Sequence, residues 1–99
     1  MRESTRQQIQ AELNQLEAQI KAIEAEGDYF LQAWVSSSKP SERKQTYPRV
    51  QSRLPQFGGK KVRHIRQDES VADWVAMCDR GQKIGRLVKR REQLAARLD

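Results

Sequence analysis

The chain has 99 residues and is basic, with 19 Lys and Arg against 13 Asp and Glu and a formal net charge of +6. Apolar residues make up 36% of it and charged residues 32%, which allows one domain at most, with a modest core. Its longest apolar run, residues 74–78, is far too short to span a bilayer, and a single cysteine cannot form an intramolecular disulfide. We therefore expect a cytoplasmic protein with no membrane partner.

The positive charge is concentrated in the middle of the chain. Residues 1–29 carry three bases and six acids, residues 30–66 carry nine bases and one acid, and residues 67–99 carry seven bases and six acids. The middle segment therefore has a net charge of +8, which exceeds that of the entire chain. A basic segment of this kind indicates where an anionic partner would bind.

The first segment predicts an α-helix over residues 4–26. Its apolar residues are spaced alternately four and three apart, which is the heptad pattern of helices that pack against a partner helix. Ser4 and Gln7 have the spacing of a capping box, and Gly27 ends the pattern. We expect this seam to pack the helix and to mediate self-association. The seam residues are Ile9, Leu13, Leu16, Ile20 and Ile23.

The central segment predicts a two- or three-stranded antiparallel sheet, because aromatic and β-branched residues recur between short polar connections. The expected strands lie at about 28–36, 46–54 and 60–66. Alternation along the first strand would put Phe30 and Trp34 on the same face.

A pair of glycines, Gly58-Gly59, predicts a turn before the last strand. With Lys60 it also suggests a phosphate-binding loop, but the preceding glycine and the following Ser or Thr of that motif are missing. A glycine turn between strands is therefore the preferred interpretation.

The last segment predicts a second helix over residues 70–98, with a long apolar stripe at helical spacing. Ser70 and Asp73 have capping spacing at its start. Gly81 and Gly85 lie inside it and cost about 1 kcal/mol each relative to alanine. Either they allow another helix to approach closely, or the helix breaks near Gly81; we favour one continuous helix.

These elements predict an α+β fold in a single domain over residues 1–99. Two helices would form an antiparallel, coiled-coil-like hairpin, with the small antiparallel sheet between them. The last helix carries a basic stripe made of Lys83, Arg86, Arg90 and Arg97. We expect this stripe to pair with acids of the first helix, although it would alternatively extend a nucleic-acid footprint. The expected acidic partners are Glu12, Glu17 and Glu24.

Residues suited to catalysis or metal binding are sparse. His64 and Cys78 are the only residues of their types, and they lie in different predicted elements. No pair of carboxylates has an apolar setting, and no Cys or His cluster has metal-ligand spacing. We therefore expect no enzyme, no metal and no cofactor.

The basic strands favour nucleic-acid binding. Arg49 and Arg53 would share one face of the second strand, so a two-stranded ribbon would follow a groove or a phosphate backbone. The binding candidates are Arg43, Lys44, Arg49, Arg53, Lys60, Lys61 and Arg63. The candidates for stacking on unpaired bases are Trp34, Tyr47 and Phe57. Alternatively, the charges deter edge-to-edge aggregation and the aromatic residues cover the core.

Two motifs carry a resemblance to known proteins. Tyr29-Phe30-Leu31-Gln32-Ala33-Trp34 and Gly58-Gly59-Lys60-Lys61-Val62-Arg63-His64-Ile65 resemble a loose group of small, uncharacterised prokaryotic proteins. Members are common in cyanobacteria and in mobile-element or phage settings, and place an aromatic strand, a glycine–lysine turn and a basic strand between coiled-coil helices.

The order of strands and helix is also similar to the arm-binding domains of tyrosine recombinases, which grip DNA with a three-stranded sheet. That similarity implies a DNA face comprising Arg49, Arg53, Lys61 and Arg63. We predict a small DNA- or RNA-binding protein with a regulatory or mobile-element role that uses the basic sheet. The alternative is a coiled-coil module that binds a protein partner or oligomerises.

Overall fold

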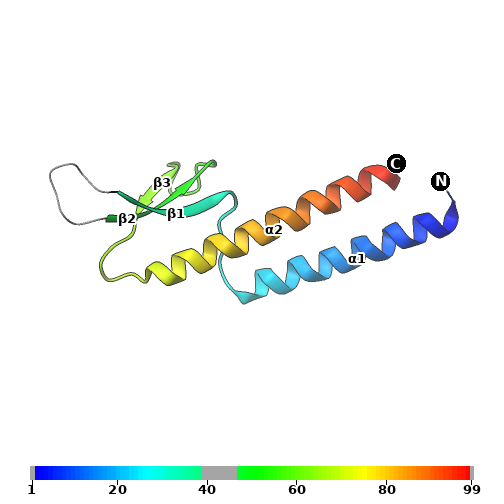
Figure 1. Cartoon of the computed structure of the whole chain (residues 1–99), viewed down its shortest axis with the longest axis horizontal. Helices are drawn as coiled ribbons and strands as arrows, with labels where there is room; N and C mark the ends of the chain where they lie inside the picture. The colour runs from blue at the N-terminus through cyan, green and yellow to red at the C-terminus, as the bar shows by residue number, and fades with distance from the viewer. Residues whose placement is uncertain (1, 39–46, 99) are drawn as a thin grey trace.

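The computed structural model describes residues 2–38 and 47–98, and it confirms the α+β class. Helix α1 (Glu3–Glu26) is followed by strands β1 (Ala33–Ser38), β2 (Tyr47–Ser52) and β3 (Val62–His64), and then by helix α2 (Val71–Leu98). The molecule is elongated, 65 × 22 × 22 Å. In Figure 1 the two helices run antiparallel, the sheet packs on the N-terminal half of α2, and both ends of the chain lie at the far end of the hairpin.

The helical hairpin buries the heptad seam of α1. Ile9, Leu13 and Leu16 form an apolar cluster with Leu94 of α2, and Leu87 and Leu98 pack against it. Ile20 is buried as well, and Ile23 is half-buried. The seam is thus covered within the chain, and the self-association that we expected it to mediate is not needed to bury it.

The two helices begin differently. Ser70 caps α2, because its Oγ accepts a hydrogen bond from the Asp73 amide at 3.3 Å, as predicted. The capping box predicted at Ser4 is wrong: α1 starts at Glu3, so Ser4 lies inside the helix, and the N-cap Arg2 makes no side-chain capping bond.

A second apolar cluster joins the sheet to α2. The strands have the order β1-β2-β3, and both pairs are antiparallel. Val50, at the centre of β2, is 0% exposed. The buried members are Ala33, Val50, Ile65 and Cys78, and the partly buried ones are Phe30, Val35, Phe57 and Trp74. Each half of α2 therefore serves a different core, one with the sheet and one with α1.

The connection between α1 and β1 differs from the prediction, because β1 begins at Ala33 rather than near residue 28. The residues before it form a turn in which Gln32 has a φ of 51°. The Gln56 side chain holds this turn: its Oε1 accepts a hydrogen bond from the Leu31 amide at 3.0 Å, and its Nε2 donates to the Leu31 carbonyl at 2.6 Å. The turn breaks the alternation, so Phe30 lies on the core side and not on the face of Trp34.

Helix α2 is continuous through both glycines. A Cβ on Gly81 would collide with the backbone of Phe30, whereas a Cβ on Gly85 would meet nothing within 4 Å. Gly81 therefore allows the α1–β1 connection, and not another helix, to approach α2. The Phe30 amide donates a hydrogen bond to the Met77 carbonyl at 3.4 Å in this contact.

The predicted glycine turn is confirmed. Gly58 and Gly59 have φ values of 61° and 81°, as the central residues of a two-residue hairpin turn require. Phe57 and Lys60 exchange backbone hydrogen bonds of 3.0 and 3.2 Å across it. The strands around this turn are shorter than predicted, since β2 ends at Ser52 and β3 spans three residues.

Candidate nucleic-acid interface

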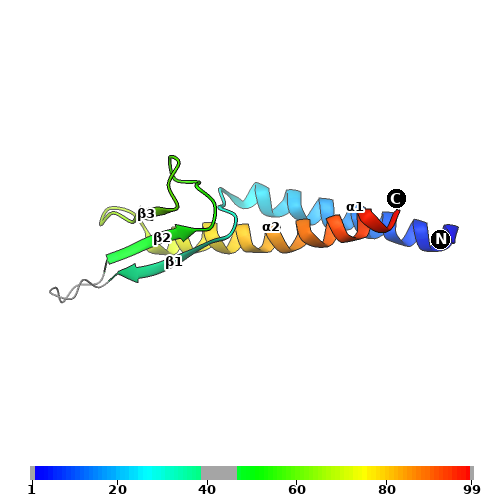
Figure 2. The same ribbon diagram turned by 90° about the horizontal axis from the view of Figure 1, so that it is seen from above.

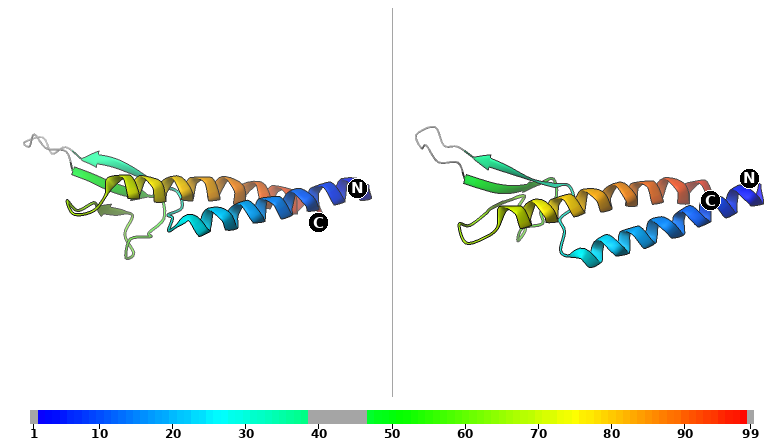
Figure 3. Two further views of the ribbon diagram at one scale, coloured as in Figure 1. Left: turned by 90° about the horizontal axis from the view of Figure 1, so that it is seen from below. Right: turned by 60° about the horizontal axis from the view of Figure 1, so that its bottom comes forward.

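The two faces of the sheet have different surroundings. Residues paired across antiparallel strands point to the same face, so the aligned row Val35, Val50 and Arg63 faces α2. In Figure 2 the strands are seen with no helix in front of them, whereas from below, in Figure 3, α2 passes in front of the sheet. We call the surface away from α2 the open face. Its side chains belong to Trp34, Ser36, Tyr47, Arg49, Gln51, Val62 and His64.

Hydrogen bonds connect several side chains on the open face. The Trp34 indole Nε1 donates to Oε1 of Gln51 at 3.2 Å, and the Ser36 hydroxyl donates to the same oxygen at 3.0 Å. Arg49 Nε in turn donates to the Ser36 hydroxyl at 3.4 Å. The bond to Gln51 ties the indole of β1 to strand β2, while Trp34 remains 41% exposed. The open face thus presents an aromatic ring whose position is fixed by a neighbouring strand.

Arg63 does not belong to the open face, which corrects the prediction that it shares a face with Arg49. The residue aligned with Arg49 on β3 is His64. Arg63 points to the α2 side, where its Cζ lies 4.6 Å from the centroid of the Trp74 ring and its Nη2 lies 3.0 Å from Oε2 of Glu69. Its buried Nη1 has no hydrogen-bond partner among the described residues, and the stacking on Trp74 supplies a cation–π contact to the guanidinium instead.

Glu69 completes this arrangement on the α2 side. Its Oε1 accepts a hydrogen bond from the Arg66 amide at 3.0 Å. This backbone bond, together with the guanidinium of Arg63, lowers the pKa of the Glu69 carboxyl below its ordinary range. The charge of Arg63 is therefore paired within the chain.

The other predicted basic residues lie beyond the strand ends. Arg53 follows β2, and Lys60 and Lys61 precede β3; all three are exposed. Their backbones are tied into the fold, since the Ser52 amide donates to the Lys61 carbonyl at 2.8 Å. They do not share a strand face with Arg49, although they lie near one end of the sheet. Arg43 and Lys44 lie outside the described residues.

Of the stacking candidates, Phe57 is in the core, which corrects its predicted role. Its ring centroid lies 5.0 Å from that of Phe30, which in turn stacks on Trp74 at 5.6 Å. Trp34 and Tyr47 are on the open face. Ser36, Gln51 and His64 are not among the predicted binding residues, because the register that aligns them across the strands cannot be read from the sequence. Alternation along the second strand does place Gln51 on the face of Arg49 and Arg53.

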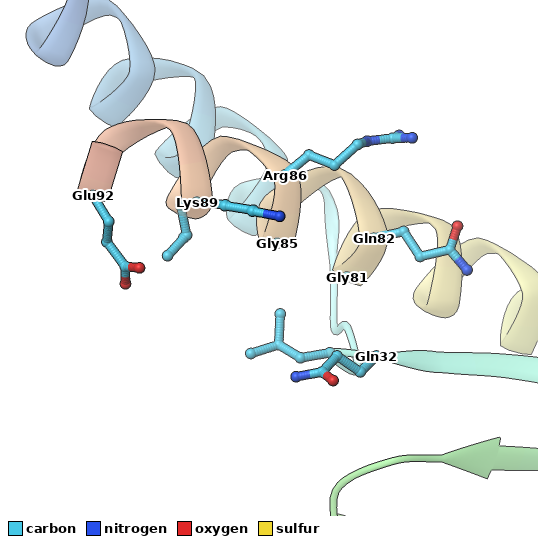
Figure 4. Close-up of a pocket in the computed structure, with 9 residues that line it drawn as sticks. Gln32, Gly81, Gln82, Gly85, Arg86, Lys89 and Glu92 are labelled. Atoms are coloured by element: carbon cyan, nitrogen blue, oxygen red, sulfur yellow. The ribbon is translucent and has the colours of Figure 1, made fainter. Parts of the chain in front are cut away.

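A hollow follows α2 beside the turn before β1, and we call it the α2 groove. Figure 4 shows Arg86 and Lys89 projecting from α2 on one side of it and Gln32 from the turn on the other. Its lining residues are Leu31, Gln32, Gly81, Gln82, Gly85, Arg86, Val88, Lys89 and Glu92.

Arg90, from the predicted basic stripe, pairs with Glu12 across the hairpin, with 3.2 Å between Nε and Oε1. Within residues 2–38 and 47–98, no ion pair involves Glu17 or Glu24. Among the described residues, Arg90 is therefore the one member of the basic stripe that forms the expected ion pair with α1.

Two further observations apply to the described part of the chain. No group of three or more His, Cys, Asp or Glu side chains in it is placed to hold a metal ion. Neither helix, over its described length, is long and apolar enough to cross a membrane.

Compared with known proteins, the chain matches no protein-family model, and no curated protein or solved structure is significantly similar to it. The resemblances to the small prokaryotic group and to recombinase arm-binding domains therefore stay predictions.

Proposed function

We propose that this protein binds nucleic acid through the open face of its sheet. The observation that supports the proposal is an exposed, hydrogen-bonded Trp34 on the same face as Arg49 and His64. Aromatic rings that stack on bases and cations that contact phosphates are the two components of many nucleic-acid surfaces.

The charge around the open face favours an anionic ligand. Residues 47–66, which include β2 and β3, contain six Lys and Arg and no Asp or Glu. The guanidinium of Arg63 is paired with Glu69, and Arg49 remains as the arginine of the open face. Each base that neutralises a phosphate releases counterions, so binding should weaken steeply as salt is added.

The experiment is a titration of labelled DNA and RNA, followed by fluorescence anisotropy at low and at moderate salt. We expect Arg49→Glu to weaken binding about tenfold or more and to reduce the salt slope by about one. Arg6→Glu is the matched control, because it makes the same charge change on exposed α1 at the opposite end of the molecule. Affinity no better than about 10⁻⁴ M at low salt, or equal effects of the two reversals, would refute the proposal.

A second candidate function is protein binding or oligomerisation by the helical hairpin. The α2 groove favours it, because space is open above Gly85. The seam of α1 is unsuited to testing this candidate, since Leu13→Asp would disrupt the core of the hairpin. Gly85→Leu fills the groove instead, and light scattering would reveal whether it dissociates a complex that the unaltered chain forms.

A further inference from the structure

We infer that the open face binds unpaired nucleotides, with one base stacked on the indole of Trp34 and the adjoining phosphate beside Arg49. This inference rests on the proposed function and specifies its ligand as single-stranded nucleic acid. It follows from the arrangement of side chains in two neighbouring rows across the sheet.

The first row is largely apolar. Trp34, Gln51 and Val62 are aligned across the three strands, and Trp34 and Val62 are 41% and 37% exposed. The second row, Ser36, Arg49 and His64, is polar and cationic. The two rows are two residues apart along the strands, or about 7 Å.

A nucleotide has the same two parts, an apolar base face and an anionic phosphate separated by a sugar. The apolar row matches the base, and the cationic row matches the phosphate. The hydrogen bond from Trp34 to Gln51 fixes the indole before a ligand arrives, so less side-chain freedom is lost on binding. The two rows therefore fit a nucleotide whose base is free to leave its own stack.

A duplex fits this surface less well. Its base faces are stacked on one another, and only the base edges, which carry mostly hydrogen-bonding groups, are accessible in the grooves. Against such a groove, the exposed Trp34 and Val62 would bury apolar surface without a matching partner. An unpaired base instead offers its ring face, and stacking of this kind tolerates any base.

The test uses the full chain with Trp74→Phe, so that Trp34 is the sole tryptophan. Oligo(dT), oligo(U) and a DNA duplex of equal length are titrated at one salt concentration, and poly-glutamate serves as a purely anionic polymer. We expect both single strands, or one of them, to quench Trp34 emission and to bind at least about tenfold more tightly than the duplex. The comparison of oligo(dT) with oligo(U) distinguishes DNA from RNA.

Variants of Trp34 provide the second readout in the otherwise unaltered chain. Trp34→Ala should weaken single-strand binding about tenfold and leave duplex binding unchanged, and Trp34→Phe should restore part of the loss. Val75→Ala is the control, because Val75 is 40% exposed on α2. If Trp34→Ala fails to fold, the quenching of Trp34 emission and the affinity of the Trp34→Phe variant still test whether a base stacks on the indole.

The outcomes separate this inference from the proposed function. The inference would be overturned if the duplex bound as tightly as the single strands, or if single-strand binding neither quenched Trp34 nor weakened in Trp34→Ala. The proposed nucleic-acid binding would still hold in both cases. Equal affinity for poly-glutamate and the single strands would overturn it as well, since charge alone would then explain binding. An absence of binding to every nucleic acid would overturn both.

Discussion

Gly81 and Gly85 lie four residues apart on α2, and replacing each by alanine should change stability in different directions. In a helix interior, alanine is favoured over glycine by about 1 kcal/mol. A Cβ at Gly85 meets nothing within 4 Å, so Gly85→Ala should raise the free energy of unfolding by about that amount. At Gly81 the Cβ would lie 2.5 Å from the carbonyl carbon of Phe30 and 3.2 Å from the amide nitrogen of Leu31.

The Phe30 backbone carbonyl oxygen lies closer still, and it would have to move by about 1.5 Å for the Gly81→Ala Cβ to reach an ordinary contact distance of 3.4 Å from it. That backbone is held on one side by Met77 and on the other by Gln56. Its movement would also disturb the stacking of Phe30 on Trp74. Overpacking of this kind costs about 1–3 kcal/mol. Because both variants gain the same helix propensity, their stabilities should differ by that cost.

The assay is equilibrium urea unfolding of the two variants and the unaltered chain, followed by far-ultraviolet circular dichroism. Equal m-values would show that the midpoints report stability alone. In thermal melts a difference of 1 kcal/mol corresponds to about 4–8 °C for a domain of this size. If Gly81→Ala proved as stable as Gly85→Ala, the close approach of α2 to the α1–β1 connection would be refuted.

Two further predictions concern titratable groups. Because the Arg66 amide and Arg63 lower the pKa of Glu69 below its ordinary 4.5, its stabilisation is fully present above pH 4.5 and is lost as the pH falls through the folded-state pKa. Glu69→Gln should therefore lower the thermal midpoint at pH 7 and change little at pH 2; equal shifts at both pH values would contradict this. Burial, and secondarily the charge of Asp79, raises the pKa of the Cys78 thiol, so an aromatic disulfide reagent should react with the folded protein far more slowly than with urea-unfolded chain. Equal rates would show an accessible thiol.

Local periodicity was sufficient to predict both helices and the hairpin turn. The heptad spacing of α1 identifies its buried seam without knowledge of the partner, because one helix repeat determines which side chains share a face. Gly58 and Gly59 likewise indicate their turn directly, since both adopt positive φ values. These features depend on residues close together in the chain.

The start of β1 and the face of Arg63 depend on distant residues. The side chain of Gln56, 25 positions away, hydrogen-bonds the Leu31 backbone in a turn, so β1 begins only at Ala33. The register of β3 decides whether residue 63 or 64 is aligned with Arg49, and a shift of one residue reverses every side chain. Trp74, in the first turn of α2, and Glu69, just before that helix, accommodate Arg63 on the face that packs against α2. Alternation in the sequence predicts two faces, but not which of them is covered.

Helix α2 packs in two separate cores, one with the sheet and one with α1. The number of residues between its two packing sites therefore sets how the hairpin is rotated relative to the sheet. Cys78 packs with the sheet, and Leu94 packs with α1. One residue inserted between these positions would rotate the hairpin by about 100° relative to the sheet. Seven residues added to both helices would instead preserve each facing surface and lengthen the molecule by about 10 Å. The hairpin thus acts as a spacer whose length can change in whole heptads while the open face remains intact.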